Sequence, residues 1–280
     1  MTTHPPFSTI TLGAITFRDR NLPSVLSAAR NAGFESVGIT VGQCIAALER
    51  GIAFEEIAAA IRDAGLRVGE LELIRLGDGG PARHANALVV ELASILQPDR
   101  VHVAAWGAEA AAVGDEFASV CAQLAPLPVA YEFMPYNSIP SFTRALELVE
   151  STAAPNAKIV LDILHFFRSG SAFEELTADA LSHVAVVQLS DVIQREVTPS
   201  LVEEARHRRT YPGAGDLNSL GFLQAIAVAA EEPVPLSIEP ISDALELLPL
   251  MLVAEEAMLS TQRLLKRALK EFEATADQVS

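Results

Sequence analysis

Polar side chains end four apolar runs in the second half of this sequence, and they are Glu132, Asp162, Gln188 and Glu239. Each run has the length and the β-branched content of a buried strand. The four positions are separated by 30, 26 and 51 residues, and each interval is long enough for a helical crossover. Parallel strands joined by crossovers end at the same edge of a sheet or barrel. The four side chains could therefore converge on one point.

Three carboxylates at one point repel one another, so they either bind protons or bind a cation. An all-oxygen ligand set that includes a neutral amide favours a hard divalent ion over Zn²⁺. A lone acidic residue at a strand end is usually solvated or caps the next helix, but four successive polar ends are harder to explain in that way. We predict a metal site formed by Glu132, Asp162, Gln188 and Glu239. Mn²⁺ is the expected ion, with Mg²⁺ or Co²⁺ as alternatives.

Two further features lie close to these strand ends in the sequence. His165 follows Asp162 by three residues, which makes it a candidate catalytic and substrate-binding residue rather than a core histidine. A basic cluster, residues 206–209, precedes the turn Pro212-Gly213 in an otherwise acidic chain. The cluster is either a solvated charge run or the source of one arginine that turns inward to bind substrate oxygens.

The elements that must position these residues alternate between short apolar runs and longer segments with helical spacing. We expect strands at Ser8–Ala14, Ser36–Thr40, Arg67–Ile74, Arg100–Ala105, Val129–Phe133, Lys158–Asp162, Val184–Leu189 and Pro235–Glu239. We expect helices at Leu22–Ala32, Phe54–Ala64, Ala82–Leu96, Glu109–Leu124, Ile139–Ala153 and Leu220–Ala230, with Gly33 and Gly65 ending the first two. Eight such units with right-handed crossovers predict an α/β fold, a single (β/α)8 TIM barrel.

The C-terminal segment 244–275 is predicted to be one long amphipathic helix or a pair of helices. It is longer than one barrel helix requires, so it could cover the barrel floor or a partner subunit. Its apolar surface makes a homo-oligomer plausible. No linker rich in Gly, Ser or Pro interrupts the 280 residues, so residues 1–280 are interpreted as one domain.

Composition excludes several classes of protein. With 50% hydrophobic and 20% charged residues the chain is neither disordered nor fibrous, and its net charge of −16 disfavours nucleic acid as a partner. No apolar run reaches the roughly 18 residues of a membrane helix, and the N-terminus does not resemble a signal peptide. The two cysteines, Cys44 and Cys121, are isolated in helix-like stretches. We therefore expect a cytoplasmic protein.

The motifs around the strand ends resemble the xylose isomerase-like TIM-barrel superfamily, the group of sugar phosphate isomerases and epimerases. The resemblance lies in Tyr131–Pro135, Leu161–Phe166, Val187–Asp191, Tyr211–Asp216 and Leu236–Glu239. These pieces follow the family's order through the second half of the chain. In the first half, many relatives carry a Glu on the second strand, whereas Ser36–Thr40 has none.

This resemblance implies roles for individual residues. Glu132, Asp162 and Glu239 would be metal ligands, and Glu132 and Glu239 would also act as acid and base. The remaining ligand in keto-sugar epimerases is usually His, whereas the matching residue here is Gln188. In this respect the chain is similar to bacterial 3-dehydroshikimate dehydratases, which share the PG-x-G loop and its preceding arginine. Arg209 would accordingly bind substrate.

Together these observations predict a divalent-metal-dependent sugar isomerase or epimerase acting on a hydroxylated carbonyl compound through a metal-stabilised enediolate. The alternative is a dehydratase of the 3-dehydroshikimate dehydratase type that uses the same enolate chemistry. A DNA-repair endonuclease would need further metal ligands and a basic groove, and a non-catalytic binding protein would tolerate loss of Glu132 or Glu239. Schiff-base chemistry is disfavoured because lysine occurs only at Lys158, Lys266 and Lys270.

Overall fold

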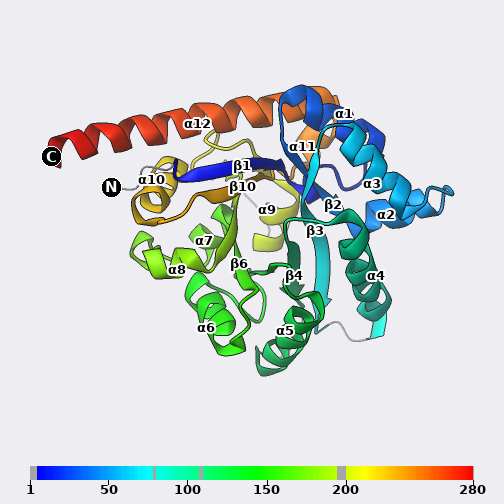
Figure 1. The fold of residues 1–280 in the computed structure, drawn as a ribbon. Coiled ribbons are helices and arrows are strands. Elements are labelled where there is room, and N and C mark those ends of the chain that lie inside the picture. Colours follow the sequence, from blue (N-terminus) through cyan, green and yellow to red (C-terminus); the bar gives the residue numbers. More distant parts are fainter. Residues whose placement is uncertain (1–4, 78–79, 107–109, 194–199, 280) are drawn as a thin grey trace.

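The computed structural model describes residues 5–77, 80–106, 110–193 and 200–279. Eight parallel strands close into a barrel in the order β1-β10-β7-β6-β5-β4-β3-β2, which confirms the predicted (β/α)8 architecture (Figure 1). The barrel strands are β1 (Phe7–Leu12), β2 (Ser36–Thr40), β3 (Arg67–Leu76), β4 (Val101–Ala105), β5 (Val129–Glu132), β6 (Ala157–Asp162), β7 (Val184–Leu189) and β10 (Val234–Ile238). Each expected strand agrees with the observed one to within two residues at either end.

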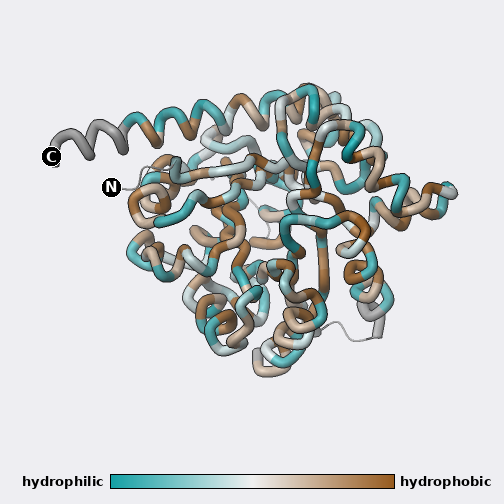
Figure 2. Tube along the Cα trace, viewed as in Figure 1, coloured by the Kyte–Doolittle hydropathy of each residue, from teal (hydrophilic) through white to brown (hydrophobic). Residues whose placement is uncertain are grey.

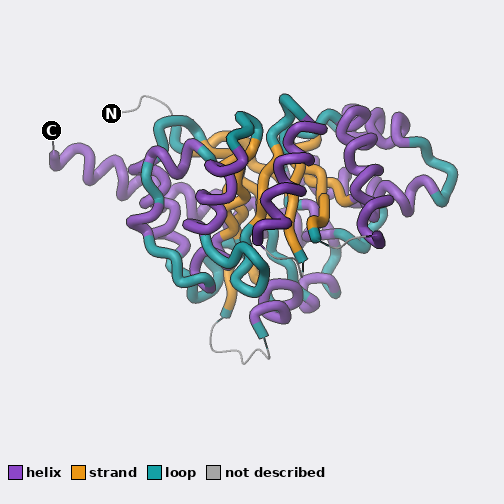
Figure 3. The backbone as a smooth tube through the Cα atoms, turned by 90° about the horizontal axis from the view of Figure 1, so that it is seen from below, coloured by secondary structure: helices purple, strands orange, loops and turns teal. Residues whose placement is uncertain are grey.

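Helices surround the barrel, and a view at right angles shows the strands inside them (Figure 3). They are α1 (Leu22–Ala32), α2 (Val41–Leu48), α3 (Phe54–Asp63), α4 (Gly80–Leu96), α5 (Ala110–Leu124), α6 (Phe142–Thr152), α7 (Ile163–Arg168), α8 (Ala178–Ser182), α9 (Leu201–His207), α10 (Ser219–Ala229), α11 (Asp243–Glu246) and α12 (Leu250–Val279), with 3-10 turns η1 (Ala14–Phe17) and η2 (Phe173–Glu175). The six expected barrel helices are all present, although the expected start at Glu109 lies outside the described residues. No residue range was predicted for α2, α7, α8 and α9, although Cys44 of α2 was placed in a helix-like stretch. These four are too short to show an apolar period.

Local sequence explains where α1 begins and ends. The Asn21 side chain accepts a hydrogen bond from the Ser24 amide and so caps the N-terminus of α1. Gly33 follows the helix with φ of 85°, in the left-handed region where glycine carries no steric penalty. Gly65 ends the next expected helix in the same conformation. Both glycines confirm the predicted helix ends.

The C-terminal segment forms the pair α11 and α12. Helix α12 packs against α1 and α10, so it takes the place of the eighth outer helix instead of covering the barrel floor. Val253, Ala254 and Ala257 form part of its buried face, whereas Leu252 and Leu259 are exposed. Figure 2 shows that hydrophobic and hydrophilic residues alternate along α12, as in an amphipathic helix.

A continuous hydrophobic core fills the space between the barrel and the helices. It includes both cysteines, which are free thiols, as their positions in apolar helices predicted. Among the described residues, no helix is both long enough and apolar enough to cross a membrane.

Candidate active site

The four predicted strand-end residues occupy four consecutive strands of the barrel. Glu132 and Asp162 end β5 and β6, Gln188 is the second-last residue of β7, and Glu239 directly follows β10. Asp162 and Gln188 are register partners across β6 and β7, and all four side chains are buried. The strand order β5-β6-β7-β10 therefore brings the predicted residues to one end of the barrel, as parallel topology requires.

A compact set of possible ligand atoms is formed by Glu132, Asp162 and His165, whose ligating atoms all lie within 4.8 Å of one another. His165 Nε2 lies 3.4 Å from Glu132 Oε1. This set differs from the predicted ligands by including His165, and Glu239 does not belong to it. The Gln188 amide on the neighbouring strand has no partner for either its oxygen or its nitrogen among the described residues. A buried amide without a hydrogen bond is costly, so this side chain fits a bound ion or substrate.

Arg209 is the arginine of the basic cluster that turns inward, whereas Arg206 is exposed. Its Nη1 donates to Asp162 Oδ2 at 2.6 Å and to Ser190 Oγ at 3.3 Å, and its Nε donates to the Ala205 carbonyl. Burial alone would raise the pKa of Asp162, but the charges of Arg209 and His165 hold it below its usual value. The structure therefore shows one arginine of the cluster turned inward, and its role in binding substrate stays a prediction.

Asp162 has a second role. Its Oδ1 accepts a hydrogen bond from the His165 amide at 2.9 Å and caps the N-terminus of α7. The helix-capping interpretation of a strand-end carboxylate therefore also holds at this position, because each oxygen of Asp162 has a different partner.

The chain segment around the PG-x-G motif fixes the backbone that carries Arg209. Strands β8 (Asp191–Val192) and β9 (Arg209–Thr210) pair in antiparallel fashion. The Asp191 carboxylate accepts hydrogen bonds from the Leu217 amide and the Ser219 hydroxyl. A Cβ at Gly215 would lie 2.4 Å from Asp191 Oδ1, so only glycine fits there. The motif therefore shapes a turn rather than cradling a phosphate.

Glu239 is the last of the four predicted strand-end residues and directly follows β10. Its Oε1 accepts a long hydrogen bond, 3.4 Å, from the Ile15 amide. Burial and then the charge of Glu72 raise the pKa of Glu239 well above its usual value. The charge of Arg209 acts on four buried carboxylates, Glu72, Glu132, Asp162 and Glu239, and Arg100 is a second guanidinium that acts on Glu72, so the carboxylates still outnumber the guanidinium groups. A divalent cation would balance this excess of negative charge, so the residues present fit a metal ion.

The sequence prediction missed Glu70 and Glu72 on β3 and His102 on β4, all buried in the barrel. A search of strand ends alone could not find them because they lie within strands. The available signal was the alternation Glu70-Leu71-Glu72, which places both acids on one face of a strand that is otherwise apolar at this point.

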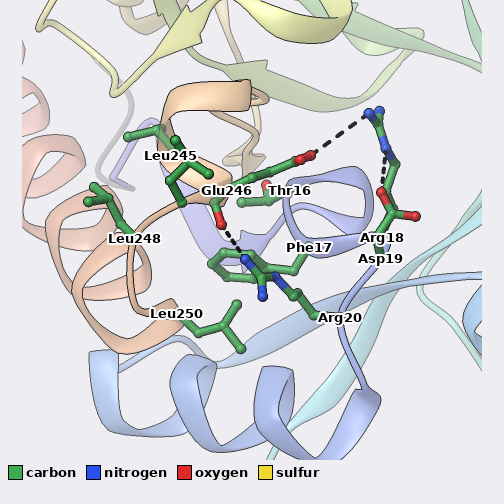
Figure 4. A pocket seen from close by; sticks show the side chains of 10 residues that line it. Thr16, Phe17, Arg18, Asp19, Arg20, Leu245, Glu246, Leu248 and Leu250 are labelled. Atoms are coloured by element: carbon green, nitrogen blue, oxygen red, sulfur yellow. Dashed lines mark hydrogen bonds and ion pairs between the residues drawn. The ribbon is translucent and has the colours of Figure 1, made fainter.

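A separate cavity of about 280 Å³ lies between the segment Thr16–Arg20 and the segment Leu245–Leu250 (Figure 4). Arg20 donates to the Glu246 carbonyl across it, and Arg18 lies near the carboxylates of Asp19 and Glu246. None of the predicted site residues lines this cavity. The cavity is therefore separate from the buried carboxylates.

The family model described as "xylose isomerase-like TIM barrel" matches residues 26–266. The chain belongs to this family. A search of curated protein sequences gives no match. The matched range covers most of the chain, so it extends the resemblance that was seen in the second half of the sequence.

Several solved structures share the fold. A xylose isomerase-like TIM barrel/4-hydroxyphenylpyruvate dioxygenase fusion protein aligns with a TM-score of 0.81 at 20% identity and covers 96% of this chain. This chain spans only 44% of that fusion protein. An IOLI protein with a bound zinc atom aligns with a TM-score of 0.78 at 15% identity, covering 93% of this chain and 99% of its own.

Two enzymes with different reactions also align. They are the probable 3-DHS dehydratase AsbF of Bacillus anthracis (TM-score 0.71, 15% identity, 91% of this chain and 99% of that chain) and an L-ribulose 3-epimerase (TM-score 0.69, 16% identity, 96% and 98%). At these identities the alignments establish the fold, and the reaction has to be argued from the site.

Proposed function

We propose that this protein is a divalent-metal-dependent isomerase or epimerase of a polyhydroxylated carbonyl compound. One observation carries the proposal: the buried carboxylates Glu132 and Glu239 flank Asp162 and Gln188, on the consecutive strands β5, β6, β7 and β10. Two carboxylates on opposite sides of a bound substrate can remove a proton from one face and return one to the other. Proton return to the opposite face gives epimerisation, and return to the neighbouring carbon gives isomerisation.

The residues present divide this work between them. Glu132, Asp162, Gln188 and Glu239 would hold the ion, with His165 as an additional candidate ligand from the compact set. A divalent ion at this position would polarise the substrate carbonyl and so acidify the adjacent C–H bond. The carboxylate of Glu132 or Glu239 would then take the proton from that carbon.

His165 and Arg209 would orient the substrate oxygens. The His165 ring is held between Glu132 and Tyr136, whose ring meets it edge to face at 5.7 Å. The Arg209 guanidinium is fixed by Asp162, Ser190 and the Ala205 carbonyl, so its charge is already in place when negative charge develops on the substrate. The Arg209 side chain therefore does not have to rearrange during the reaction.

A dehydratase is the second candidate, and Gln188 is the observation that favours it. The chain has an amide where keto-sugar epimerases usually have His, and dehydratases of this superfamily share that feature. Loss of a β-hydroxyl group from the same enolate would give the dehydrated product. Both reactions share the first proton transfer, so one experiment can test the shared step and separate the outcomes.

The experiment combines metal binding with solvent exchange. We expect the purified protein to bind Mn²⁺ with a gain in thermal stability, and to incorporate deuterium beside the carbonyl of a keto-sugar in D₂O. Glu132→Gln and Glu239→Gln should each lower the exchange rate by at least about 100-fold, within the range for loss of a general acid or base. Asp99→Asn serves as the control and should exchange at the wild-type rate. Asp99 lies in the loop that precedes β4, at the end of the barrel away from Glu132 and Glu239.

The products distinguish the two candidates. Deuterated epimer or isomer supports the first, and loss of water supports the second. Absence of Mn²⁺ binding, or absence of exchange across a panel of keto-sugars and 3-dehydroshikimate, would reject the shared chemistry.

A further inference from the structure

A chain of four buried ionisable side chains runs across β3 and β4, apart from the predicted metal ligands. Arg100 Nη2 donates to Glu70 Oε2 at 3.1 Å, and His102 Nε2 lies 3.5 Å from the same oxygen. On its other side, His102 Nδ1 lies 2.7 Å from Glu72 Oε1. The order is therefore Arg100, Glu70, His102 and Glu72, and none of the four is more than 3% exposed.

The Glu70 end of this chain is structural. Glu70 Oε1 accepts hydrogen bonds from the Ala14 amide and the Ser237 hydroxyl, and its Oε2 faces Arg100. Although burial opposes ionisation, the charges of His102 and Arg100 with these hydrogen bonds keep the pKa of Glu70 below its usual value. Glu70, Glu72 and His102 are close enough together to suggest a second metal site. However, Glu70 Oε1 already accepts two hydrogen bonds and its Oε2 faces both Arg100 and His102, whereas each oxygen of Asp162 has one partner, so a cation is less favoured at Glu70 than at Asp162.

Glu72 differs because one of its oxygens is free. Its Oε1 meets His102, but its Oε2 is buried without a hydrogen-bond partner among the described residues. A buried acceptor without a partner is costly, and such atoms are commonly satisfied by a ligand or by ordered water. The free oxygen is therefore a second independent sign of a ligand, beyond the clustering of acidic groups.

The position of Glu72 follows from the strand register. Glu70 contacts Ser237 across the barrel interior, and side chains two residues apart on a strand share a face. Glu72 lies two residues beyond Glu70, and Glu239 lies two residues beyond Ser237. Both side chains therefore face the barrel interior, one layer closer to the carboxyl ends of the strands than the contact between Glu70 and Ser237. Burial and then the charges of Glu70 and Glu132 raise the pKa of Glu72 well above its usual value, while the charges of Arg100 and Arg209 oppose this shift. The charge of Glu72 in turn contributes, after burial, to the raised pKa of Glu239. Strand β3 lies opposite β7 in the barrel order, so Glu72 and Gln188 come from opposite sides of the barrel.

We propose that Glu72 binds a hydroxyl group of the substrate on the side of the site opposite Gln188, and that His102, Glu70 and Arg100 are its positioning residues. This inference rests on the proposed function and adds a substrate class to it. A phosphate or carboxylate at this end of the substrate would meet Glu72 and Glu239, while Arg100 is already paired with Glu70. The end of the substrate that contacts β3 is therefore an uncharged polyol.

The experiment uses the four pentitols (ribitol, xylitol and the two arabinitols) as uncharged probes and measures their binding to the Mn²⁺-loaded protein by calorimetry and thermal shift. We expect at least one pentitol to bind the wild type in the millimolar range. Glu72→Leu should weaken its binding at least tenfold, because leucine fills the space without a polar atom. Glu72→Gln retains both a donor and an acceptor, so it should bind within about threefold of wild type.

His102→Gln tests positioning. It should weaken pentitol binding by less than Glu72→Leu while leaving Mn²⁺ affinity unchanged. Asp99→Asn is the control carboxylate and should change neither quantity, because Asp99 lies on the loop before β4, where it is exposed and paired with Arg67. Circular dichroism and Mn²⁺ titration establish that each variant is folded.

The results separate this inference from the proposed function. Unchanged pentitol binding by a folded Glu72→Leu variant overturns the inference, as does loss of Mn²⁺ affinity in Glu72→Gln, which would make Glu72 a metal ligand. Failure of every pentitol to bind the wild type also overturns it. A wild type that fails to bind Mn²⁺ counts against the proposed function instead, and the pentitol comparison is then made on the metal-free protein.

Discussion

The ion pair between Arg209 and Asp162 gives the most demanding prediction from this structure. Both side chains are buried, with 3% and 0% exposure, and their atoms approach to 2.6 Å. With charge centres about 4 Å apart and an effective dielectric constant of about 20, the attraction is about 4 kcal/mol. Removing one partner of a buried pair typically costs about 3–5 kcal/mol because it leaves an uncompensated charge. We expect Arg209→Met to lower the free energy of unfolding of the metal-free protein by this amount.

The assay is a double-mutant cycle of Arg209→Met, Asp162→Asn and the combined variant, followed by urea unfolding. We expect a coupling free energy of about 3 kcal/mol, reduced from the full attraction because an unpaired Asp162 can take up a proton. Mn²⁺ should stabilise Arg209→Met by at least about 1 kcal/mol more than it stabilises the wild type, since the ion replaces the missing positive charge.

The pair between Arg67 and Asp99 provides the matched control. Its side chains are 53% and 39% exposed, so Arg67→Met should cost no more than about 1 kcal/mol and should not respond to Mn²⁺. A coupling below about 1 kcal/mol between Arg209 and Asp162, or equal Mn²⁺ stabilisation of Arg209→Met and wild type, would refute the electrostatic account of the site.

Two further predictions concern the same end of the barrel. Burial and the charge of Glu72 raise the pKa of Glu239, so Mn²⁺ binding should release a proton and its affinity should increase with pH through that raised pKa. Calorimetry in buffers of different ionisation enthalpy measures the number of protons released when Mn²⁺ binds. A Mn²⁺ affinity that does not change with pH would contradict the assignment of Glu239 as a metal ligand. Gly215→Ala should lower the free energy of unfolding by about 2–3 kcal/mol, because the added Cβ would clash with Asp191 and the Val192 carbonyl. An unchanged urea midpoint would show that the turn relaxes to accept the Cβ without cost.

The order of the barrel elements could be predicted from the sequence because each strand and helix is specified by residues close together in the chain. Apolar runs such as Val184–Leu189 end at the same residue in the sequence prediction and in the structure. The helix Leu22–Ala32 is bounded by a capping asparagine and a left-handed glycine, and both act through neighbouring residues. By contrast α9 has only seven residues, and no period could identify it. Its position depends on contacts such as the ion pair between Glu204 and Arg168, which lie 36 residues apart.

Residues of the candidate site could be predicted from the sequence where a polar side chain lies at the end of a strand. Glu132, Asp162, Gln188 and Glu239 stand out because each closes an apolar run, and parallel topology then gathers them. Glu72 ends no apolar run. Its alternation with Leu71 places it on the same face of the strand as Glu70, but only the closed barrel shows that this face is buried. The choice among four successive basic or histidine residues, 206–209, also required the structure.

The sequence by itself determined the alternation of strands and helices, the closed barrel that follows from eight such units, and the strand ends at which polar groups gather. These features depend on residues close together in the chain, whose spacing fixes the local backbone. Only the tertiary structure decided which charges pair: that Arg209 meets Asp162, that Glu70 is satisfied by Arg100 and Ser237, and that one oxygen of Glu72 has no partner among the described residues. Pairing and burial are set by distances across the barrel, between residues that the chain alone leaves far apart.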